Sequence, residues 1–115
     1  MDTLLVFTNV PDQECAQRMA RMLVENRLAA CVNILAPCHS IYRWQDGLES
    51  ADEIPLLIKT TLARYTAVEE AIRQQHPYAV PEIIALPITQ GLPAYVRWVT
   101  ESSASDASPY PPYYA

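Results

Sequence analysis

The chain has 115 residues and a mass of 12.9 kDa, which suits one domain with a single core. Half of the residues are apolar, so folding is expected, yet no apolar run reaches the roughly 18 residues of a membrane span. A net charge of -5 argues against binding to nucleic acid or to an anionic membrane, because both require a basic surface. Three cysteines without CxxC spacing, and an N-terminus without signal-peptide features, favour reduced thiols in a cytoplasm.

The first elements are a strand and a helix. Thr3–Asn9 is a short run rich in strand-forming residues and predicts a buried strand. Pro11 suits the first position of a helix of about four turns, which we expect to end near Asn26 or Arg27. Its apolar stripe is Ala16, Met19, Ala20, Leu23 and Val24.

A long hairpin is predicted next. Ala29–Trp44 has the composition of a strand, with an interruption at Pro37, which cannot donate to a strand ladder. Asp46 and Gly47 form a strong turn signal, and Glu53–Thr61 is the expected returning strand. Residues 29–44 would extend about 50 Å, beyond the roughly 35 Å width of such a domain. The hairpin must therefore bend or project beyond its own domain.

A projecting hairpin has a consequence for assembly. Ile41, Tyr42, Trp44 and Leu48 lie near its tip and would expose apolar surface unless another subunit covers them. The geometry therefore predicts a homo-oligomer.

The second half repeats the order of helix and strand. A helix over Leu62–Gln75 is expected to stop at His76, because the residue before a proline avoids helical dihedral angles. Glu82–Ile88 is the fourth strand, and its flanking prolines place it at an edge. A short helix over Ala94–Ser102 follows, so residues 1–102 form the domain and 103–115 a tail rich in Ser, Pro and Tyr. The order β-α-β-β-α-β with an extra C-terminal helix predicts a ferredoxin-like α+β fold.

Thiols and imidazoles are the candidate metal ligands. Cys38 and His39 point to opposite faces of a regular strand, so they cannot bind one ion together. His76 at a helix end suits capping of the last carbonyls, and Cys15 suits packing. Neither HxxxH, CxxC nor clustered carboxylates are present, which disfavours a preformed zinc site.

Several polar and aromatic residues could line a cleft or a subunit interface. A carboxylate and an amine at a subunit boundary could bind a polar ligand, although solvated strand ends and ion pairs explain Glu53, Lys59 and Glu82 equally well. Aromatic residues beside the turn suit interface anchors or a stacking platform. The candidate set is Tyr42, Trp44, Glu53, Lys59, Tyr78 and Glu82.

Catalytic motifs do not appear. The sequence has no GxSxG, no P-loop and no dinucleotide fingerprint, and two glycines are too few for a phosphate cradle. One phenylalanine and a negative net charge disfavour an RNA-recognition module. A metallochaperone of this fold would carry CxxC after the first strand. We therefore expect no enzyme.

Several motifs carry a family resemblance. They are TNVPD (8–12), LAACVNI (28–34), YRWQDG (42–47), LLIKT (56–60) and HPYAVPEI (76–83). Over about residues 3–100 the chain resembles the CutA divalent-cation-tolerance family. The resemblance implies a ferredoxin-like fold related to the PII proteins, and a cytoplasmic homotrimer whose long hairpin embraces a neighbour.

The resemblance leaves two functions open. The first is a trimer that binds or responds to copper, with Cys31 and His76 as the matching candidate ligands. The second is a PII-like sensor that binds a small polar ligand at the subunit interface. Neither hypothesis involves nucleic acid or a membrane.

Overall fold

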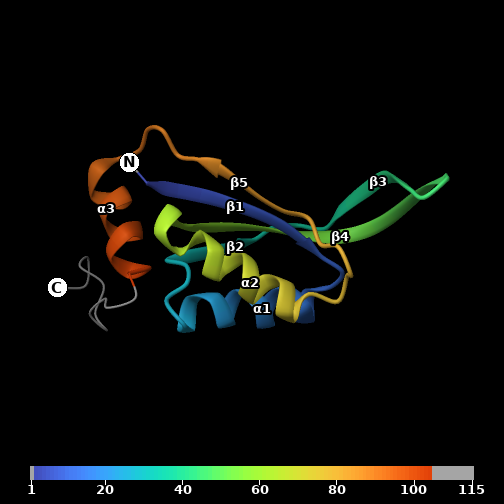
Figure 1. Ribbon diagram of the computed structural model, residues 1–115, viewed down its shortest axis with the longest axis horizontal. Coiled ribbons are helices and arrows are strands. Elements are labelled where there is room, and N and C mark those ends of the chain that lie inside the picture. The colour runs from blue at the N-terminus through green and yellow to red at the C-terminus, as the bar shows by residue number, and fades with distance from the viewer. Residues whose placement is uncertain (1, 105–115) are drawn as a thin grey trace.

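The computed structural model describes residues 2–104 of the chain, so all but the first two residues of the predicted tail, 103–115, lie outside the described part. An antiparallel sheet in the order β2-β4-β1-β5 carries α1 and α2 on one face, and β3 pairs with the far part of β4 (Figure 1). This arrangement confirms the ferredoxin-like α+β fold with an extra C-terminal helix and an extended hairpin. The elements are β1 (Thr3–Val10), α1 (Gln13–Glu25), β2 (Cys31–Ile34), β3 (Cys38–Trp44), β4 (Gly47–Thr61), the 3-10 turn η1 (Leu62–Arg64), α2 (Tyr65–Gln75), β5 (Ile83–Pro87) and α3 (Pro93–Ser102).

The core lies between the sheet and the helices α1 and α2. Alternate residues of β1 point into it, as the period of a strand requires, and both Val6 and Val10 are fully buried. Met19 and Leu23 of α1 pack against the same cluster. The prediction that Pro11 opens the helix was wrong by two residues, because Asp12 is the N-cap and accepts a hydrogen bond from the backbone N–H of Cys15 at 2.8 Å.

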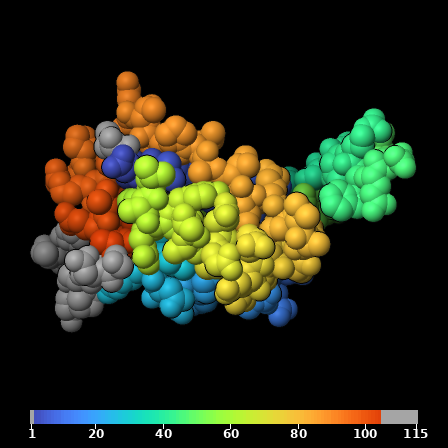
Figure 2. All heavy atoms as spheres, viewed as in Figure 1, coloured from blue at the N-terminus to red at the C-terminus, as the bar shows by residue number. Residues whose placement is uncertain are grey.

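The hairpin stands clear of the body (Figure 2). The paired register with β4 ends at Ile34, Leu35 still donates from its backbone N–H to the carbonyl of Pro55 at 3.0 Å, and pairing resumes at Cys38 beyond Pro37, which was expected to break the strand. The molecule measures 52 × 27 × 24 Å, so the tip projects as the length argument predicted. The returning strand is longer than predicted, since it begins at Gly47 rather than Glu53. Its first six residues have no run of strand-forming side chains, and only their pairing with β3 makes them a strand.

The C-terminal half follows the predicted order with shifts at the element ends. The helix expected from Leu62 starts with a 3-10 turn, and α2 stops at His76 with its backbone extended. Strand β5 pairs only with β1 among the described residues, so its edge position is confirmed. Ser103 is fully buried and donates from its hydroxyl to the carbonyl of Val99 at 2.6 Å, so the folded body extends one residue past α3.

The sheet face away from α1 and α2 is largely apolar, and we call it the open face. Directly paired residues share a face, and Phe7 pairs with Ile84 while Leu5 pairs with both Leu86 and Lys59. Ile84 is 51% exposed and Leu86 is 57% exposed. The single chain therefore leaves apolar sheet surface uncovered.

Candidate functional site

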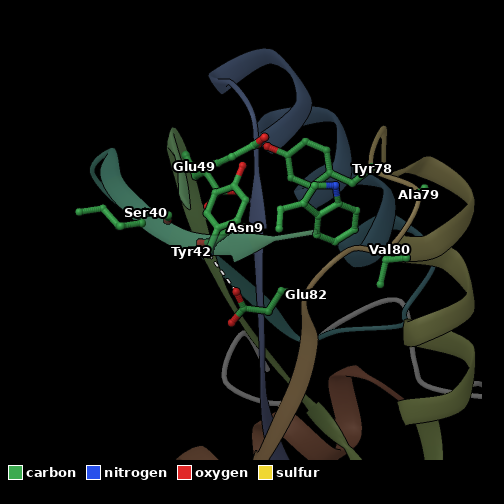
Figure 3. Close-up of a pocket in the computed structure, with 11 residues that line it drawn as sticks. Asn9, Ser40, Tyr42, Glu49, Tyr78, Ala79, Val80 and Glu82 are labelled. Atoms are coloured by element: carbon green, nitrogen blue, oxygen red, sulfur yellow. Dashed lines mark hydrogen bonds between the residues drawn. The ribbon is translucent and has the colours of Figure 1, made fainter. Parts of the chain in front are cut away.

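A pocket of about 490 Å³ lies at the base of the projecting hairpin. Three segments that are far apart in the sequence form its walls: the end of β1, the hairpin of β3 and β4, and the segment between α2 and β5 (Figure 3). Such a volume is typical of sites for small organic ligands. The lining residues are Asn9, Ser40, Ile41, Tyr42, Trp44, Glu49, Glu53, Tyr78, Ala79, Val80 and Glu82.

The hairpin register decides which of its side chains face this pocket. Tyr42 pairs directly with Glu49, and Cys38 pairs with Glu53. Because side chains alternate along a strand, Ser40, Tyr42 and Trp44 share the face that carries both carboxylates. Five of the six candidate cleft residues thus meet in one pocket, and Lys59 is the exception.

Asn9 is the most buried polar side chain at the pocket together with Glu53. It is 8% exposed, and its amide nitrogen donates to Oε1 of Glu82 at 3.3 Å (Figure 3). The carboxylate can only accept, which fixes the amide orientation. The amide oxygen of Asn9 is buried and has no hydrogen-bond partner. Buried acceptors are rarely left unpaired, so this oxygen marks a place where a donor is missing.

Glu53 and Tyr78 face each other across the pocket from different elements. Glu53 is 9% exposed. Burial raises the pKa of the Tyr78 phenol, and the negative charge of Glu53 and a hydrogen bond to it add to the rise. The phenol therefore stays protonated at neutral pH and holds the carboxylate in place as a donor.

His76 has a structural position beside the pocket. Its Nε2 lies 2.7 Å from the carbonyl oxygen of Asn9, and its Nδ1 accepts from the backbone N–H of Tyr78 at 3.1 Å. The ring is therefore the neutral tautomer with the proton on Nε2. The expectation that His76 caps the last carbonyls of its own helix was wrong, because the imidazole binds the end of β1 instead. Both ring nitrogens are engaged.

Cys31 lies elsewhere on the sheet. It pairs with Lys59, which pairs with Leu5, so the thiol faces the open face. His76 is tied to Asn9, four residues further along β1, or about 13 Å at ordinary strand rise. Lys59 donates to Asn33 on the same open face and takes no part in the pocket. The two proposed copper ligands therefore do not meet within one chain.

The other candidate ligands are also separated. His39 pairs with Asp52 at 2.8 Å on the outer face of the hairpin, while Cys38 points toward the pocket side, as the alternation of strand residues predicted. Within residues 2–104, no three His, Cys, Asp or Glu side chains are close enough to hold one metal ion. None of the helices in that range is long and apolar enough to cross a membrane.

The sequence did not identify two polar residues that line the pocket, Asn9 and Glu49. Glu49 could have been found, since the turn before Gly47 pairs Trp44 with Gly47 and hence Tyr42 with Glu49. Asn9 had no comparable signal, because only the tertiary fold brings the end of β1 to Glu82.

The fold and the pocket define a class: a ferredoxin-like α+β protein with a projecting hairpin and an acidic, aromatic pocket at its base. The family model of the CutA1 divalent ion tolerance protein matches residues 4–102. The chain belongs to the CutA1 family. This family is named for tolerance to divalent ions and not for an enzymatic reaction.

Relatives and solved structures agree with this assignment. The divalent-cation tolerance protein CutA of Thermus thermophilus is 46% identical over 99 residues, covering 86% of this chain and 96% of that protein. The crystal structure of CutA from Xylella fastidiosa superposes with a TM-score of 0.88 at 40% identity, covering 90% of this chain and all of that one. A structure described as the periplasmic divalent cation tolerance protein CutA of Archaeoglobus fulgidus gives 0.86 at 33% identity, covering 89% and 99%.

Proposed function

We propose that the protein works as a homotrimer in the tolerance of, or response to, divalent metal ions, with copper as the ion. The observation that carries the assembly is the apolar surface that one chain leaves uncovered. Ile84 and Leu86 are exposed on the open face, and Ile41 and Leu48 at the hairpin are 71% and 73% exposed. Apolar surface on this scale is typical of interfaces between subunits.

Light scattering in the presence of a chelator tests the assembly. The expected species has three times the mass of 12.9 kDa, because apolar contacts rather than metal hold it together. Leu86→Asp should dissociate it, while Val24→Asp, at an exposed apolar residue of α1, should leave it intact. A stable monomer in the unmodified protein would refute the trimer.

The role in tolerance of divalent ions is supported by the description of the family and by that of the Thermus relative, and copper is the ion that we propose. It does not require Cys31 and His76 to form a site in one chain, which the geometry disfavours. Three unpaired thiols within the described residues support a reducing, cytoplasmic setting. Growth of cells lacking the protein at raised copper, with and without the native chain restored, tests the role. Equal growth in both strains would refute it.

A second candidate is a PII-like sensor of a small polar ligand. The pocket favours it, because the buried amide oxygen of Asn9 lacks a donor beside the carboxylate of Glu82. Equilibrium dialysis against copper and against a panel of nucleotides and metabolites separates the two candidates. Saturable binding of one panel compound, reduced by Glu82→Gln, supports the sensor, and binding of copper alone refutes it.

A further inference from the structure

Every charged side chain that lines the pocket is acidic. Glu49 and Glu53 come from the hairpin, and Glu82 comes from the segment before β5. The lining contains no lysine, arginine or histidine, and the chain carries a net charge of -5. Walls of one sign concentrate ligands of the opposite sign, so the pocket repels anions and attracts cations.

The amide oxygen of Asn9 in the pocket lacks a hydrogen-bond donor. The hydrogen bond from the amide nitrogen of Asn9 to Glu82 fixes the orientation of the amide. In this orientation the amide oxygen is buried and has no hydrogen-bond partner. A ligand that fills this gap carries an N–H or O–H group, and a carboxylate beside the gap favours a charged N–H donor.

The remaining lining residues call for an organic body. Tyr42, Trp44 and Tyr78 present aromatic rings from the hairpin and from the segment after α2, and Val80 adds apolar surface. Aromatic faces attract organic cations and pack against hydrocarbon. A bare divalent ion needs several oxygen or nitrogen ligands around one point, and within residues 2–104 the acidic groups are too far apart for that.

We infer that this pocket binds a protonated organic amine with an apolar or aromatic body. The ammonium group lies against the carboxylate of Glu82, next to the amide of Asn9, and the body lies against the aromatic side chains. This inference rests on the second candidate function, the small-ligand sensor, and names the class of its ligand.

Tryptophan fluorescence of the full-length protein tests the ligand class. The chain has two tryptophans, and Trp44 lines the pocket while Trp98 lies on α3, so a Trp98→Phe background isolates the signal of Trp44. The probes are 2-phenylethylamine, its neutral counterpart 2-phenylethanol, and copper sulfate. The amine is expected to shift the emission saturably and to bind at least about tenfold more tightly than the alcohol, because its hydrogen bonds are charge-assisted.

Two variants locate the amine. Glu82→Gln keeps the shape of an exposed side chain and should weaken amine binding about tenfold. Asp52→Asn removes the same charge from the outer face of the hairpin and should leave binding within about twofold, since screening weakens distant exposed charges. Circular dichroism of both variants checks that they fold.

The outcomes separate this inference from the proposal on which it rests. Equal binding of amine and alcohol would refute the cation class but leave a small-ligand pocket. A response of Trp44 to copper alone would overturn the inference in favour of a metal site. If neither probe binds and no compound of the metabolite panel binds, both the inference and the sensor proposal fail.

Discussion

Replacing His76 by alanine tests whether this ring is a structural link or a metal ligand. The ring is 8% exposed and joins two backbone groups, the carbonyl of Asn9 and the N–H of Tyr78. Losing both hydrogen bonds costs about 1–3 kcal/mol. The tilted contact between the rings of His76 and Tyr78, with centroids 4.8 Å apart, adds about 0.5–1.5 kcal/mol. The free energy of unfolding should therefore fall by about 1.5–4.5 kcal/mol.

Urea unfolding at one fixed chain concentration measures this change, because association and folding are linked in a trimer. His39→Ala is the matched control. His39 is the other histidine of the chain and forms an exposed pair with Asp52, so its loss should cost less than about 1 kcal/mol. Copper titration is run on the same samples. A His76→Ala protein of unchanged stability that binds less copper would refute the structural reading and restore His76 as a ligand.

Three further predictions concern titration, thiol reactivity and copper. Burial raises the pKa values of Cys15 and Tyr78 above 9.0 and 10.0, so the unfolded chain loses these protons first. The stability that the neutral groups provide is complete below those values and falls as pH rises through the folded pKa values. Urea midpoints measured from neutral pH to about pH 11 will show the fall, and midpoints that do not change above about pH 9 would contradict it. Cys15 is 4% exposed and should react with a maleimide only as fast as the protein unfolds, whereas faster labelling would contradict its burial. If Cys31 binds Cu(I), calorimetry should show weaker binding in Cys31→Ser and at pH 6 than at pH 8, because the thiol must lose its proton; unchanged binding would exclude it.

The order of elements could be predicted from the sequence because each signal is local. The break at Pro37, the turn before Gly47 and the helix stop at His76 each depend on the backbone chemistry of one or two residues. The start of β4 was missed for the opposite reason. Its first residues, 47–52, are mostly exposed and carry no run of strand-forming side chains, and they form a strand only through pairing with β3.

The candidate site could be predicted only in part for the same reason. Tyr42 and Trp44 are identifiable as aromatic residues beside a turn. Lys59 was predicted to line the same cleft, but its side chain lies on the open face and not in the pocket. The sequence gives no local signal that separates it from the pocket residues. Whether it contributes to a subunit interface stays a prediction. Asn9 can be recognised as a pocket residue only from the fold, which places the end of β1 beside Glu82.

Strand β4 and the hairpin that it forms with β3 belong both to the pocket and to the proposed subunit interface. Strand β4 is continuous over 15 residues, pairing with β1 and β2 in the body and with β3 in the hairpin. The register of paired residues breaks between Ile34 and Cys38, so the hairpin is joined to the body mainly through β4 and through the pocket at its base. A ligand whose ammonium group binds Glu82 of the body and whose apolar part packs against Tyr42 and Trp44 of the hairpin would hold these two parts in one relative position. The same hairpin is proposed to embrace a neighbouring subunit, so ligand binding in the pocket would change the free energy of trimer assembly. By thermodynamic linkage, assembly would change the free energy of ligand binding by the same amount.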